Sequence, residues 1–113
     1  MKGTYLGEFQ EIVLLAVLIL NEEAYGVRIQ EEIEKETSRS VSRGALHTAL
    51  TRLEEKGFLT SEWGKATEER GGRRKRLYVV TNMGKEALRE AKMLREQMWN
   101  RVPEWALNIS YGI

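Results

Sequence analysis

Hydrophobic and polar residues follow a helical period in the first part of the chain. The block from about Glu8 to Leu20 is apolar on nearly every side in its second half, which is typical of a helix enclosed by others. The block from about Tyr25 to Glu36 places Ile29 and Ile33 one turn apart among charged residues. This second pattern predicts an amphipathic helix that lies at the surface.

A third helix has the best-marked ends in the sequence. Ser42 is a favourable N-cap residue, and Val41 before it can pack on Leu46 as a hydrophobic staple. Gly57 stands where a helix commonly ends on a left-handed residue, and Phe58 beyond it can fold back on the last turn in a Schellman motif. We therefore expect the helix to fill the interval between these two ends.

Two strand-like segments follow the third helix. Residues 59–63 alternate Leu, Ser and Trp on one face, and residues 77–80 are β-branched and aromatic. The segment between them, with a Gly-Gly pair, is typical of a hairpin loop, and we expect Trp63 to face the core. Three helices and a hairpin in a chain of 113 residues predict a mainly α fold with a small β-hairpin, the winged helix-turn-helix.

A fourth helix is predicted after Thr81, a suitable N-cap, and Pro103 should end it. Apolar residues recur along it at spacings of three and four. Because the first three helices and the hairpin already form a complete unit, we expect a second copy of the chain to cover this stripe. The predicted dimer interface consists of Leu88, Ala91, Leu94, Met98 and Trp99, and Trp99 is either its anchor or the wall of a ligand pocket.

Composition narrows the classes of function. No Cys is present, and His47 is the one histidine, without a second catalytic group beside it in the sequence. No cluster of His and carboxylates has metal-ligand spacing, so we expect neither an enzyme nor a metal or cofactor. The longest apolar run, residues 12–20, is shorter than the roughly 20 residues that span a membrane. We therefore expect a cytoplasmic protein with no membrane partner.

Cations are concentrated in the predicted hairpin loop. The chain holds 18 Lys and Arg against 17 Asp and Glu, so affinity for a polyanion must come from the arrangement of the charges. Five of the 18 cations lie between Arg70 and Arg76, and Arg73, Arg74, Lys75 and Arg76 follow one another. A cationic loop beside a helix that reads DNA can hold phosphates or enter the minor groove. This pattern predicts a wing.

The outward face of the third helix is polar. Its first half is nearly free of anions, whereas Glu54 and Glu55 make its end acidic, so the N-terminal half is the end that can enter a DNA groove. Arg43 can pair with guanine or a phosphate there, and the shorter polar groups can donate or accept hydrogen bonds. The predicted DNA-binding residues are Arg39, Ser42, Arg43, His47 and Thr48, with Arg73, Arg74, Lys75 and Arg76 in the wing.

These segments resemble PadR-type transcriptional regulators over about residues 9–94. The resemblance lies in "AYGVRIQEEI", "SRGALHTALTRLEEKGFL", the basic wing ending in "RKRLYVVT", and "TNMGKEAL" at the start of the last helix. The residues that match the family's Gly-x-Leu…Leu-x-Arg-Leu-Glu…Gly signature are Gly44, Leu46, Leu50, Arg52, Leu53, Glu54 and Gly57. The family commonly has Thr, Tyr and Pro at Ala45, His47 and Thr48, differences that bear on operator preference more than on fold.

The resemblance implies a dimeric repressor that binds a palindromic promoter site, with its last helix crossing the partner subunit. Residues 1–80 would then be the DNA-binding winged helix-turn-helix, and residues 81–113 a C-terminal dimerisation helix with a short tail. The short region after that helix is similar to the smaller branch of the family, some members of which bind flat aromatic ligands at the dimer interface.

The residues leave a second class of function open. A winged helix can grip a protein partner with the same helix and hairpin, without specific DNA binding. The exposed face of the third helix is polar and its neighbours are cationic, which argues against this alternative. Single-stranded RNA binding is weaker still as an interpretation, because the wing and the third helix lack evident aromatic residues for base stacking.

Overall fold

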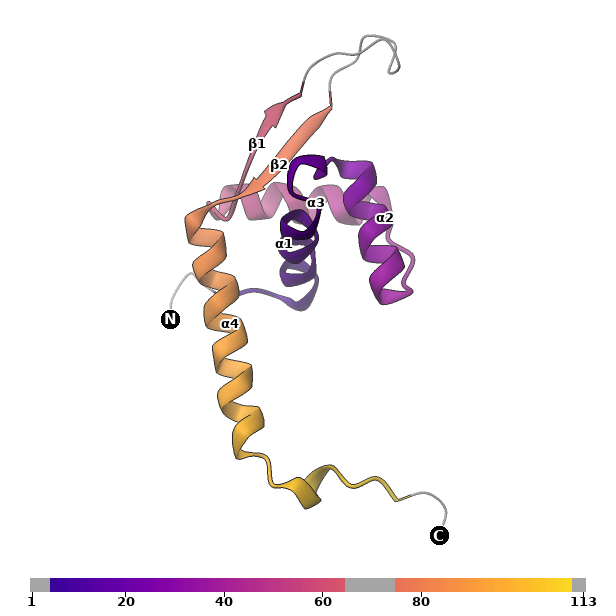
Figure 1. The fold of residues 1–113 in the computed structure, drawn as a ribbon. Coiled ribbons are helices and arrows are strands. Elements are labelled where there is room, and N and C mark those ends of the chain that lie inside the picture. Colours follow the sequence, from indigo (N-terminus) through magenta and orange to yellow (C-terminus); the bar gives the residue numbers. More distant parts are fainter. Residues whose placement is uncertain (1–4, 65–74, 111–113) are drawn as a thin grey trace.

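Three helices form the body of the protein, namely α1 (Glu8–Leu20), α2 (Gly26–Thr37) and α3 (Arg43–Glu55) (Figure 1). The computed structural model describes residues 5–64 and 75–110. A short 3-10 turn, η1 (Asn21–Glu23), links α1 to α2. The predicted first helix is confirmed, and the second begins one residue later than predicted because Tyr25 is drawn into the sheet.

Both predicted ends of α3 are confirmed. The Ser42 hydroxyl oxygen accepts a hydrogen bond from the Ala45 backbone N–H at 3.0 Å, which caps the helix. Gly57 has φ +83°, in the left-handed region, and the Phe58 backbone N–H donates to the Leu53 carbonyl at 2.9 Å. That bond is the signature of a Schellman motif. The boundaries of α3 therefore follow from purely local chemistry.

The hairpin pairs β1 (Leu59–Trp63) with β2 (Arg76–Val80) in antiparallel register, from Leu59 opposite Val80 to Trp63 opposite Arg76. The link before α2 adds to this sheet, because Tyr25 forms an isolated bridge with Leu77. The loop between the strands, residues 65–74, lies outside the described residues, so its predicted Gly-Gly tip stays a prediction.

The fourth helix, α4 (Asn82–Arg101), begins against the turn that ends α3. The Thr81 hydroxyl accepts from the Gly84 N–H at 3.0 Å and donates to the Gly57 carbonyl at 2.6 Å. Gly84 lies so close to the strand that an added Cβ would stand 2.3 Å from the Phe58 carbonyl oxygen. Thr81 is thus the predicted N-cap, and Gly84 is a glycine that close packing requires.

Only the first turns of α4 pack on the body. Ala87 and Leu88 are buried, and every residue from Lys92 to Arg101 is exposed. Figure 1 shows α4 projecting away from the three-helix body, with the tail turning aside after it. The tail contains a short 3-10 turn, η3 (Glu104–Leu107), after Pro103. Within the described ranges, no helix has the length and hydropathy required to cross a membrane.

The mainly α fold with a small β-hairpin is confirmed, but two predictions about burial are wrong. Trp63 is 56% exposed, although Leu59 on the same face of β1 is buried, so the body covers only the first part of this strand face. The second half of α1 is not enclosed either. Leu15, Leu18 and Ile19 are exposed although Val13, Leu14 and Val17 are in the core, so α1 keeps one apolar side uncovered in the single chain.

Candidate nucleic-acid interface

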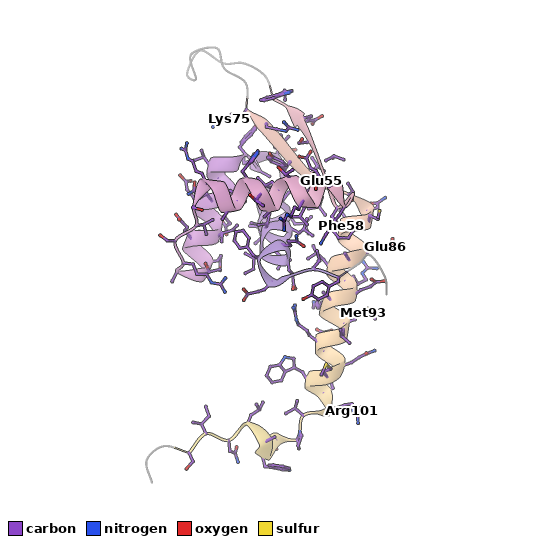
Figure 2. The ribbon with its side chains drawn as sticks, turned by 180° about the vertical axis from the view of Figure 1, so that it is seen from behind. Glu55, Phe58, Lys75, Glu86, Met93 and Arg101 are labelled. Carbon is purple, nitrogen blue, oxygen red and sulfur yellow. The ribbon has the colours of Figure 1, made fainter. Side chains whose placement is uncertain are left out.

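α3 presents the polar face that its sequence predicts. Leu46, Leu50 and Leu53 are buried at helical spacing, and Arg43 and His47 on the outward side are exposed. Figure 2 views the molecule from the side on which α3 lies uncovered across the body, with the hairpin rising past it toward Lys75. Ser42 and Thr48 are exposed as well. These four polar residues therefore share one accessible end of the helix.

Two side chains of α2 fix how the chain enters α3. The Glu34 carboxylate accepts from the Val41 backbone N–H at 2.8 Å, and the Gln30 amide donates to the Val41 carbonyl at 2.6 Å. The backbone N–H and the carbonyl of Val41 are thus both held by side chains that lie one turn apart on α2. This arrangement sets the position of Ser42 and of the first turn of α3 relative to α2.

The N-terminal end of α3 carries positive electrostatic potential. Its first turn has no acidic residue, and its free backbone N–H groups add the positive end of the helix dipole to the charge of Arg43. Glu54 and Glu55 lie at the opposite end. An anion is therefore favoured at the N-terminal end and disfavoured at the C-terminal end.

A groove of about 250 Å³ runs beside this end of α3, between α2 and the sheet. Its lining residues are Gly26, Val27, Gln30, Arg43, Leu46, His47, Leu50 and Tyr78. Burial raises the pKa of the Tyr78 phenol, with the nearby Arg76 charge acting in the opposite direction. The phenol is therefore neutral at physiological pH and brings no negative charge into the groove.

Arg39, which the sequence places among the DNA-binding residues, is turned toward α1. Its guanidinium donates to both carboxylate oxygens of Glu8, at 3.0 and 3.2 Å. The hydrogen bond and charge of Arg39 hold the pKa of Glu8 below its usual value. Both groups are exposed, so water and salt weaken the pair, and a phosphate can compete for the guanidinium.

The base of the wing is ordered by contacts with the body. The Lys75 carbonyl accepts from the Gly64 N–H at 2.6 Å, and the Lys75 ammonium lies 5.1 Å from the centre of the Tyr25 ring. Such a cation–π contact holds the ammonium at the root of the hairpin. Arg73 and Arg74 lie outside the described residues.

Arg76 contacts Ser61, Trp63 and Glu54. Its Nε donates to the Ser61 hydroxyl at 2.8 Å, and its guanidinium lies 5.5 Å from the Trp63 ring centre. Ser61 in turn donates to the Glu54 carboxylate at 2.6 Å. Arg76, Ser61, Trp63 and Glu54, which we call the wing clamp, connect both strands of the hairpin to the last turn of α3.

The predicted dimer residues fall into two sets. Leu88 packs in the core of its own chain and Ala91 is partly buried beside it, whereas Leu94, Met98 and Trp99 are 58–64% exposed. Trp99 faces a groove of about 730 Å³ between α1 and α4, which we call the α1–α4 groove. Its lining includes Leu15, Leu18, Leu88, Met93 and Trp99, with Glu11, Lys85, Arg89, Lys92, Arg95 and Glu96 among them. Arg95 also pairs with Glu11 across this groove.

Four residues that support the site, Gln30, Glu34, Tyr25 and Ser61, are not among the residues predicted from the sequence. Gln30 and Glu34 carry a usable sequence signal, because polar residues four apart on a helix lie on the same face and can contact the same neighbouring segment. Tyr25 and Ser61 carry none, because their contacts depend on the sheet register. Among residues 5–64 and 75–110, no group of three His, Asp or Glu is placed to hold a metal ion.

Comparison with known proteins gives one family. The pattern of the transcriptional regulator PadR-like family matches residues 14–90. An uncharacterized protein of Lysinibacillus sphaericus is 32% identical over 102 residues, in a match that covers 88% of this chain and 80% of that protein.

Solved structures agree with this result. A PadR family transcription regulator from Clostridium difficile R20291 is 31% identical with a TM-score of 0.63, and the match covers 88% of this chain and 99% of that one. A PadR-like transcription factor from Bacteroides fragilis is 27% identical with a TM-score of 0.66, covering 81% and 84% of the two chains.

Proposed function

The chain belongs to the PadR-like family of transcriptional regulators, which are DNA-binding proteins and not enzymes, and we propose that it is a dimeric repressor of a palindromic promoter site. In this proposal residues 1–80 bind double-stranded DNA and residues 81–113 form the dimer. The two copies of α3 enter successive major grooves about 34–36 Å apart, which is one turn of the duplex.

One observation carries the proposal. The N-terminal half of α3 is exposed, polar, free of acids in its first turn, and fixed to α2 through Val41. A helix end with these properties suits entry into a groove lined by phosphates. A protein-binding surface would be expected to expose more apolar area at this point.

We assign the DNA contacts as follows. Arg43 reads guanine or holds a phosphate, and Ser42, His47 and Thr48 donate hydrogen bonds to nearby bases or phosphates. Arg39 exchanges Glu8 for a phosphate when DNA arrives. Lys75, with Arg73 and Arg74, neutralises phosphates that flank the groove. Arg76 belongs to this cationic set and also holds the wing in place through the wing clamp.

The dimer in this proposal is built from α4. Leu94 and Met98 are large apolar side chains on an exposed helix face, and α1 leaves its own apolar side uncovered next to α4. A second copy related by a two-fold axis covers both surfaces. The α1–α4 groove lies within the 300–1,000 Å³ range of small-molecule pockets, and we assign to it a flat aromatic effector that stacks on Trp99 and relieves repression.

The test is a fluorescence-anisotropy titration against the duplex upstream of the protein's own gene, with excess random DNA as competitor and over a range of salt concentrations. Saturable binding that survives the competitor is expected. Arg43→Ala should weaken binding to this duplex more than to random DNA, by about 1–3 kcal/mol. Arg52→Ala, on the same helix but in its last turn, is the matched control and should leave this preference unchanged.

Two results would count against the proposal. Binding that disappears with competitor would reduce the wing to a general polyanion contact and favour a protein partner for α3. Equal losses on both duplexes for Arg43→Ala would make this residue a backbone contact that carries no sequence information.

A further inference from the structure

The tail after α4 exposes large apolar side chains. Trp105, Leu107 and Ile109 are 73%, 55% and 72% exposed. The tail's hydrogen bonds from Ala106 N–H to the Pro103 carbonyl and from Asn108 N–H to the Trp105 carbonyl only close its own turns. Figure 1 shows the tail running below the three-helix body rather than against it. Three such side chains in a short segment need a partner to leave water.

A second apolar groove lies on the body, between α1 and α2. It has a volume of about 280 Å³ and is lined by Ile12, Leu15, Ala16, Ile19, Glu32, Ile33, Glu36 and Thr37. Ile19 is 63% exposed at this site, the highest value on α1 among its large apolar residues. We call it the α1–α2 groove. Its floor is aliphatic and its α2 edge carries two carboxylates.

The α1–α2 groove and the α1–α4 groove meet on α1 at Leu15, which lines both of them. In the proposed dimer the partner's α4 lies on the α1–α4 groove. The chain that continues from that helix past Pro103 would then lie within reach of the α1–α2 groove.

We propose that the tail of one copy, residues 103–110, packs into the α1–α2 groove of the second copy, with Trp105 as its anchor. The inference rests on the α4 dimer of the proposed function and extends it to a second, reciprocal contact. Each copy gives one tail and receives one, as two-fold symmetry requires. The exchange buries the apolar residues of both the tail and α1.

Size and chemistry favour a side chain as the occupant. The groove volume is slightly below the range of small-molecule pockets, which suits one or two large side chains better than a free ligand. The indole of Trp105 combines a large apolar surface with a single N–H donor. Glu32 and Glu36 on the groove edge offer carboxylate oxygens that can accept this hydrogen bond.

Cross-linking tests the contact directly, because the chain has no cysteine of its own. Ile19→Cys, carrying a size tag, is mixed with untagged Leu107→Cys under mild oxidation. The mixed disulfide can form only between two copies, and its band is distinguished by size. Val79→Cys mixed with Leu107→Cys is the matched control, because Val79 is an apolar residue on the hairpin that is also exposed, at 46%. We expect a strong mixed band for Ile19 and a weak one for Val79.

A second measurement does not depend on cysteine chemistry. Trp105→Ala should raise the Kd of the dimer by about tenfold or more, as loss of an aromatic anchor does. Glu104→Ala, its neighbour in the same turn, should leave the Kd unchanged. Sedimentation gives both values.

The outcomes separate the two proposals. A sample that sediments as a dimer and binds its operator, yet gives no Ile19 band above the control, overturns tail docking and leaves the repressor proposal standing. Equal dimer Kd values for the Trp105 and Glu104 variants also overturn it. A protein that sediments as a monomer at all concentrations overturns the dimer and the tail contact together.

Discussion

The Arg76 guanidinium on β2 lies 3.8 Å from the Glu54 carboxylate in the last turn of α3, measured from Nη2 to Oε2. Ser61 stands between them and hydrogen bonds to both. The two strands that carry the wing are therefore tied to α3 by polar side chains as well as by the core. Arg76, which the sequence predicts to bind phosphate, therefore has an acidic partner in its own chain.

This relationship predicts that Glu54→Ala weakens operator binding. Removing an anion near DNA should by itself tighten binding, but losing the wing clamp lets the hairpin shift from α3. We expect a net loss of about threefold to tenfold in affinity, close to the ~1 kcal/mol that a partly exposed ion pair contributes. Anisotropy titration at fixed salt measures this change.

Glu55→Ala is the control for Glu54→Ala. It removes the same charge from the next position of α3, where the side chain is exposed, and should leave binding unchanged or slightly tighter. If both variants tighten binding equally, Arg76 acts on phosphate alone and the wing clamp has no role in recognition.

Gly84→Ala should destabilise the fold. The new Cβ would lie 2.3 Å from the Phe58 carbonyl oxygen and 2.8 Å from Val80 Cγ1, so α4 must move away from the hairpin. We expect a loss of about 1–3 kcal/mol in the free energy of unfolding, measured by urea denaturation. Gly44→Ala is the comparison, since nothing lies within 4 Å of its added Cβ. Helix propensity should make that variant more stable by up to about 1 kcal/mol, and a loss of similar size in both would contradict the packing argument.

The Glu8 and Arg39 pair predicts a specific pH response. The hydrogen bond from Arg39, and then its charge, lower the pKa of Glu8, so the pair stabilises the folded state above the ordinary Glu pKa of about 4.3. This contribution is lost as the pH falls through the lowered pKa. Arg39→Gln should raise the pKa of Glu8 in an NMR titration and make the acid limb of the stability profile shallower. Arg28→Gln, which removes the partner of Glu23, should leave Glu8 as it was.

DNA affinity gives an independent test of the pair formed by Glu8 and Arg39. If Arg39 exchanges Glu8 for a phosphate, Glu8→Gln should tighten binding to all duplexes, because the guanidinium no longer has to leave a carboxylate and an anion has been removed. Arg39→Gln should then reduce the slope of log affinity against log salt by about one. An unchanged slope would place Arg39 outside the DNA contact.

Met98→Glu should convert the protein to a monomer. The side chain is 64% exposed on the face it shares with Leu94, and a buried unpaired carboxylate opposes association in the proposed dimer. Sedimentation equilibrium measures the change, and operator binding should weaken with it. Gln97→Glu adds the same charge on a different side of α4 and should remain a dimer. Equal behaviour of the two variants would move the interface off the Met98 face.

Local chemistry made much of the fold predictable. Ser42, Gly57 and Thr81 define helix ends through bonds to residues no more than a few positions away, and these ends were found from sequence. The predicted burial of Trp63 is wrong because alternation along a strand identifies the face on which a residue lies. It does not show how far the helical body covers that face.

The candidate site was predictable to a different extent. The polar face of α3 follows from helical spacing alone, as Arg43 and His47 illustrate. The contacts of Arg76 and Tyr25 depend on strand register and on how the segment before α2 meets the sheet, neither of which is encoded in a short stretch. The pairing of Arg39 with Glu8 joins distant parts of the chain and had no sequence signal.

The turn at Gly57 and Phe58 ends α3 and also packs against the first turn of α4. The Gly57 carbonyl accepts a hydrogen bond from the Thr81 hydroxyl. The Phe58 carbonyl accepts from the Thr81 N–H and lies against Gly84. In the proposed dimer joined through α4, this joint fixes α3 relative to α4 and would therefore set the distance between the two copies of α3. Under the proposed function, the base-pair spacing of the operator would then depend on this joint and the identity of its bases on α3, so the two properties could change separately.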